Sequence, residues 1–137
     1  MDDDELTRRV CAILGTVPTW AYRPDGSAFL PREVGIVYGA VPTSPDRAIG
    51  VRVYDGDDLP GLHERRLQLH FRGAPGVAFD ADRIAGIAFT VLQGLSRRDG
   101  ISDARRVSFA PLGADGNRRE ERTDNYLITL DNTEASS

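Results

Sequence analysis

The sequence predicts an α+β protein in which a single, mostly antiparallel β-sheet carries two main helices packed on one face. Segments 2–14 and 80–97 have the apolar period of amphipathic helices. Shorter segments alternate apolar and polar residues as half-buried strands do, most clearly at 66–72. Most of the predicted strands are joined by turns short enough for antiparallel neighbours. The length of 137 residues fits one α+β domain over residues 1–131, followed by a disordered tail at 132–137.

The first predicted helix has Leu6, Val10 and Leu14 on one side. Acidic residues gather at its start, where they interact favourably with the helix dipole, and Gly15 is a typical stop. Three prolines in segment 16–33 preclude long regular structure there.

Two strands are then expected, at 34–38 and 48–54. In the second, Ile49 and Val51 fall on one face of the sheet. Residues 55–61 are rich in Asp and Gly, so we expect them to form a long loop of a hairpin that returns at 66–72.

Segment 66–72 has the cleanest alternation in the chain. We expect Leu67, Leu69 and Phe71 to face the core. The polar set is expected to face water or a partner: Arg66, Gln68, His70 and Arg72.

The second predicted helix, 80–97, has a buried stripe that includes Ile84 and Ile87. Phe89 falls outside this stripe, so it is predicted to meet another surface. Two more strands are expected, at 105–110 and 126–131.

Composition limits the possible functions. A net charge of −4 gives no pervasive positive field of the kind that draws a domain onto nucleic acid. The single cysteine, Cys11, excludes an internal disulfide and is expected to be buried. The acidic start lacks the pattern of a secretory signal, and the apolar runs are too short to span a membrane, so a soluble intracellular protein is expected.

No motif predicts a catalytic, metal-ligating or cofactor-binding residue. His63 and His70, seven residues apart, would fall on opposite faces of a strand, and ordinary surface histidines are the favoured interpretation. An alternative is a small hydrolase that uses His70 with acidic partners. A nucleic-acid binding module on the Arg66 and Arg72 face is a third class, but the inward-facing Phe71 gives it no stacking platform.

Arginines form the notable charge groups, because guanidinium groups suit carboxylates on a neighbouring subunit as well as phosphates. A solvated sheet face is the plain alternative to a subunit contact. The predicted interface residues are Phe89, Arg66, Gln68, His70, Arg72, Arg118, Arg119 and Arg122.

The C-terminal half resembles a known family. Residues 106–115 (RVSFAPLGAD), followed by 122–126 (RTDNY), are similar to the tail terminator or minor capsid proteins of long-tailed, siphovirus-like bacteriophages. Residues 35–39 (GIVYG) and 42–47 (PTSPDR) also resemble this family, as does the order of elements. The likeness covers the chain from about residue 35 to residue 132.

The resemblance implies a non-enzymatic ring protein of the virion, typically a homohexamer, without a cofactor. Such a ring caps the finished tail tube, stops its polymerisation and joins the tail to the head-neck connector. Its partners would be copies of itself, the tail tube protein and neck proteins, in particles assembled in the cytoplasm of the bacterial host. Six copies would carry a net charge of about −24, which would let DNA pass without sequence-specific binding. A head-tail connector or neck component is the alternative within the same biology.

Overall fold

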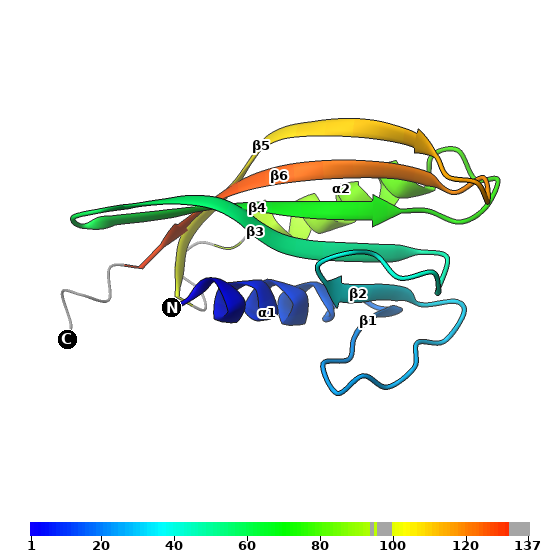
Figure 1. Cartoon of the computed structure of the whole chain (residues 1–137), viewed down its shortest axis with the longest axis horizontal. Coiled ribbons are helices and arrows are strands. Elements are labelled where there is room, and N and C mark those ends of the chain that lie inside the picture. Colours follow the sequence, from blue (N-terminus) through cyan, green and yellow to red (C-terminus); the bar gives the residue numbers. More distant parts are fainter. Residues whose placement is uncertain (94, 96–99, 132–137) are drawn as a thin grey trace.

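A computed structural model of the chain describes residues 1–93, 95 and 100–131. These residues form a six-stranded sheet with the order β1-β2-β3-β4-β6-β5, accompanied by two helices (Figure 1). The fold is therefore α+β, as predicted. The β1–β2 and β2–β3 pairs are parallel, and the other three pairs are antiparallel. The elements are α1 (Asp3–Leu14), β1 (Trp20–Tyr22), β2 (Val34–Tyr38), β3 (Ala48–Leu59), β4 (Leu62–Arg72), α2 (Asp80–Gln93), β5 (Ile101–Ala114) and β6 (Glu120–Leu130).

One hydrophobic core lies between the sheet and the helices. Helix α1 packs on β1, β2 and β3, and α2 packs on β4, β5 and β6. Leu67, Leu69 and Phe71 of β4 are fully buried in this core, which confirms the predicted inward face of that strand. On β6, the inward positions are Tyr126, Ile128 and Leu130. Both described helices share the core with the same side of the sheet, and the opposite face, here called the open face, carries neither of them.

Helix α1 begins and ends where the sequence predicts. The Asp2 carboxylate accepts a hydrogen bond from the Glu5 N–H at 2.7 Å, which caps the first turn. At the other end, the Gly15 N–H donates to the Cys11 carbonyl at 3.0 Å. Local sequence signals therefore suffice for this helix.

The Cys11 thiol is expected to be unreactive in the folded protein. The residue is fully buried, as predicted, and burial raises the pKa of its thiol to about 12. Because the thiolate is the reactive species, a disulfide reagent at pH 8 should label Cys11 only as the chain unfolds. The labelling is measured from the absorbance of the thiol that the reagent releases. Rapid stoichiometric labelling without denaturant would contradict the buried position of Cys11 in α1.

The parallel part of the sheet was not foreseen. Trp20–Tyr22 forms the short strand β1 within a segment predicted to be irregular, and it pairs with β2. Because β2 and β3 are parallel, segment 39–47 must cross the sheet to connect them, and it does so on the open face. A Cβ at Gly50 would lie only 2.1 Å from the carbonyl oxygen of Gly39. Gly50 thus permits this close crossing.

The hairpin between β3 and β4 corrects a second prediction. Residues 55–61 do not form a long loop, because β3 continues to Leu59 and β4 begins at Leu62. Backbone pairing, with Leu59 opposite Leu62, extends the ladder through the Asp-rich segment after a register shift near Tyr54. The hairpin extends well beyond the helices (Figure 1). Residues 55–64 of this hairpin are called the arm.

The remaining predictions concern α2, the last two strands and the tail. Helix α2 ends at Gln93, and Leu95, which was predicted to be helical, lies outside it; the rest of the expected continuation, residues 94 and 96–97, falls outside the described residues. Ile87 is exposed rather than buried, and Ala85 takes the inward position. Strands β5 and β6 are longer than predicted because they pair with each other almost to their turn. The predicted tail at 132–137 also lies outside the described residues.

Candidate subunit interface

The predicted interface residues fall in four separate places. The first is the open face of the sheet, where Arg66, Gln68 and His70 lie on β4. Gln68 donates from Nε2 to the Asn125 side-chain oxygen at 3.1 Å. His70 Nε2 lies 2.6 Å from a Glu121 carboxylate oxygen. Neighbouring strands therefore hold these side chains in a flat polar surface.

Arg72 does not face water or a partner as predicted, and the predicted interface residue Arg119 is not exposed either, because both are buried beneath segment 39–47. Arg72 donates to the carbonyls of Pro45 and Asp46, both at 2.8 Å, and Arg119 donates to the Thr43 carbonyl at 2.9 Å. These bonds replace the hydration that burial removes. Burial and the neighbouring charge of Arg119 lower the pKa of the Arg72 guanidinium. Both arginines therefore fix the crossing segment.

A charged cluster lies where β5 and β6 meet α2. Asp124 is fully buried and accepts from Arg122 Nε at 2.7 Å and from Arg106 Nη1 at 3.3 Å. The Arg106 guanidinium lies 4.2 Å from the centre of the Phe89 ring, and the Arg122 guanidinium lies 4.3 Å from that of Phe109. Phe89 is partly buried against the core, so Phe109 is the more exposed aromatic residue of this cluster.

Arg118 occupies a tight turn between β5 and β6. Its backbone has φ 60°, a left-handed conformation, and its carbonyl accepts from the Gly76 N–H at 2.9 Å. In the same turn, the backbone N–H of Arg119 lowers the pKa of the Asp115 carboxyl. The hydrogen bond from Gly76 joins the turn to the loop that precedes α2, and the Arg118 side chain is exposed.

Sequence reasoning missed an exposed apolar surface at this end of the molecule. Residues 107–114 of β5 are all exposed and carry no charge. Loop 73–79 adds further apolar side chains, and it is bonded through Gly73 to Glu120 of β6 and through Gly76 to Arg118 of the β5–β6 turn. Strict alternation on β5 would have predicted one buried set, but only Ile101 and Ala104 of this strand are buried. We call the exposed apolar side chains here the distal patch: Val77, Phe79, Phe109 and Leu112.

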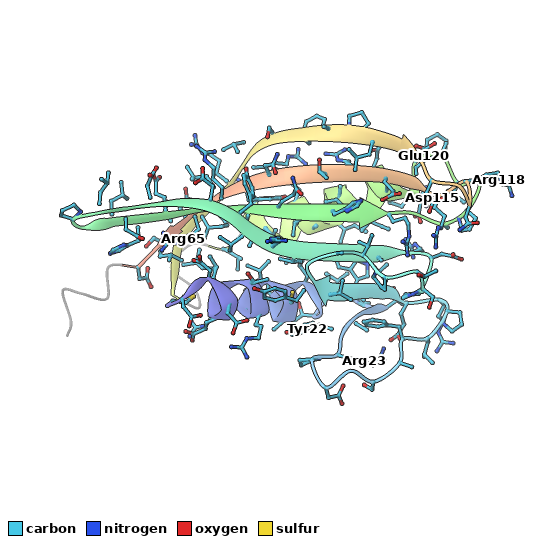
Figure 2. All side chains as sticks on the ribbon, viewed as in Figure 1. Tyr22, Arg23, Arg65, Asp115, Arg118 and Glu120 are labelled. Carbon is cyan, nitrogen blue, oxygen red and sulfur yellow. The ribbon has the colours of Figure 1, made fainter. Side chains whose placement is uncertain are left out.

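The arm and the distal patch lie at opposite ends of the sheet. The Pro60–Gly61 turn closes β3 and β4 at one end, whereas loop 73–79 follows β4 at the other. In Figure 2, Arg65 is labelled near the base of the arm and Arg118 at the opposite end of the longest axis. The two surfaces are therefore too far apart to meet within one chain.

Over residues 1–93, 95 and 100–131, no group of three or more His, Cys, Asp and Glu side chains is placed to hold a metal ion. Neither described helix is long and apolar enough to span a membrane.

A family model described as bacteriophage tail terminator protein matches residues 14–132. The chain belongs to the bacteriophage tail terminator family. This member of the family is a structural protein of the phage tail and a component of the virion. The match includes the distal patch, the arm and every predicted interface residue.

A solved structure is also similar to this tail terminator family member. It is a chain of a structure titled "Virion of native gene transfer agent (GTA) particle", with 16% sequence identity and a TM-score of 0.48. The alignment covers 88% of this chain and 83% of that chain. No curated protein matches the sequence.

Proposed function

We propose that this protein is a tail terminator that works without catalysis, as a ring of identical subunits. The ring, a homohexamer, caps the tail tube, stops its polymerisation and joins the tail to the head-neck connector. The match of the family model to residues 14–132 is the observation that carries this proposal. Assembly would take place in the cytoplasm of the bacterial host, with residues 1–131 acting as one domain.

The distribution of exposed side chains supports assembly from one kind of subunit. A closed ring built by head-to-tail contacts needs two different surfaces on each copy. The arm and the distal patch are two such surfaces, and they differ in charge and shape. We propose the open face around Arg66, Gln68 and His70 as a further contact surface, suited by its polar side chains to a neighbouring virion protein.

The net charge suits passage of DNA through the ring. Each chain carries −4, so six copies repel a polyanion on average, and binding to a particular DNA sequence is not expected.

Binding to purified tail components tests the proposed function. We expect the protein to bind the ends of polymerised tail tubes in negative-stain electron microscopy. Density at tube ends, with shorter tubes as protein is added during polymerisation, would support capping. Binding to the portal side alone would instead indicate a head-tail connector or neck component.

A His70→Ala variant tests the hydrolase alternative. Because the His70–Glu121 pair is part-buried on the sheet face opposite the core, we expect its loss to change tube capping by less than about fivefold, which corresponds to a pair worth ~1 kcal/mol. The readout is tube length at fixed protein concentration, with Glu121→Gln as the matched variant. A folded His70→Ala protein without any capping activity would contradict this expectation and would mean that His70 acts either in catalysis or in a contact of the open face.

A further inference from the structure

The arm is an acidic hairpin with an apolar tip. Residues 55–64 include four carboxylates and neither Arg nor Lys. Leu59 and Leu62 pair at the tip and are 56% and 40% exposed. Such side chains at the end of a projecting hairpin are typical of a contact with another protein.

Two carboxylates of the arm face each other. Asp57 and Glu64 are direct partners in the β3–β4 ladder, and like charges in that position repel. Neither has an ion-pair partner among the described residues. A cation supplied from outside the chain would relieve the repulsion.

The distal patch has the complementary character. Phe79 is 66% exposed and Leu112 is 54% exposed. Arg83 lies one helical turn after Phe79, and the Arg118 backbone is bonded to the loop that carries Phe79. Both guanidinium groups are exposed and have no ion-pair partner in the part of the chain that the structure describes. The patch thus combines apolar side chains with available positive charge.

We propose that the arm of one copy docks on the distal patch of the next copy. Leu59 and Leu62 pack against Phe79 and Leu112, while the arm carboxylates meet the arginines beside the patch. The two surfaces lie at opposite ends of the sheet, so this pairing joins subunits head to tail. The proposal rests on the ring of the proposed function and names the contact that closes it.

Two variants, each lacking one surface, test the contact. Leu59→Ser with Leu62→Ser removes the arm tip, and Phe79→Ser with Leu112→Ser removes the patch. All four side chains are exposed, so circular dichroism and the melting temperature should match those of the unchanged protein. Native mass spectrometry should show loss of the ring in each variant, with subunit affinity weakened by about tenfold or more.

Mixing the two variants gives the decisive result. The variant without the arm tip keeps its patch, and the variant without the patch keeps its arm. An equimolar mixture should therefore form one-to-one pairs and no larger species. Leu30→Ser is the matched control, because Leu30 is similarly exposed but lies in the loop between β1 and β2. It should retain the ring.

A charge-reversal pair provides an independent readout. Asp57→Arg and Arg118→Asp should each weaken the ring when alone. Their equimolar mixture should restore the ring, because every contact joins opposite charges when the two variants alternate around it. Rings in both serine variants, or no rescue in this mixture, would overturn the proposed contact and leave the capping function intact. A monomeric unchanged protein at all concentrations would overturn both.

Discussion

Replacing Gly50 by alanine is expected to lower the free energy of unfolding by about 2–3 kcal/mol. The new Cβ would lie 2.1 Å from the Gly39 carbonyl oxygen and 3.3 Å from a Val41 methyl group. The first of these atoms belongs to the backbone, so rotation of a side chain cannot relieve the contact. Segment 39–47 would have to lift from the sheet, which would also weaken its bonds to Arg72 and Arg119.

Gly86→Ala is the matched control for this prediction. Gly86 lies in α2, and an added Cβ there would have no atom within 4 Å beyond the neighbouring backbone of its own helix. Alanine favours a helix over glycine, so this variant should gain about 0.5–1 kcal/mol. Urea unfolding monitored by circular dichroism measures the free energy of unfolding of both variants. Equal effects of the two substitutions would contradict the close crossing over β3.

The second large effect is expected at Asp124. Removing its carboxylate in Asp124→Ala leaves Arg106 and Arg122 without their shared buried partner, which should cost about 3 kcal/mol. The two arginines would also be held less firmly over Phe89 and Phe109. The solvent exposure of the Phe89 and Phe109 rings should therefore increase.

Asp55→Ala provides the comparison for Asp124. Asp55 is exposed and 4.0 Å from Arg66, so its loss should change stability by less than about 1 kcal/mol. Urea unfolding of both variants gives the difference between their free energies of unfolding. Similar stabilities would mean that the Asp124 cluster contributes little, and would contradict its placement beneath the two arginines.

The sequence predicted elements wherever the signal is local. Helix α1 follows from its cap and apolar period, and the inward face of β4 follows from the alternation of Leu67, Leu69 and Phe71. Strand β1 has only three residues, too few for a period, and it is ordered by pairing with β2. The arm was interpreted as a loop because Asp and Gly are rare in strands, yet its ladder is maintained by backbone bonds.

The candidate interface was harder to predict because burial of a polar side chain depends on distant segments. Alternation placed Arg72 on the outer face, but only the fold brings the carbonyls of Pro45 and Asp46 over it. The distal patch depends in the same way on how much of β5 the rest of the fold covers, since only Ile101 and Ala104 of this strand are buried. The family resemblance, which rested on residues 106–115 among others, was confirmed by the family match even though the exposure of that segment was not foreseen.

The length of tail tubes assembled with and without this protein tests its central role most directly. Electron microscopy of tube protein polymerised alone should show a broad distribution of lengths. Addition of this protein should narrow the distribution, with a ring of density at the end of each tube. Tubes of unchanged length with bare ends, formed in the presence of folded protein, would contradict the account.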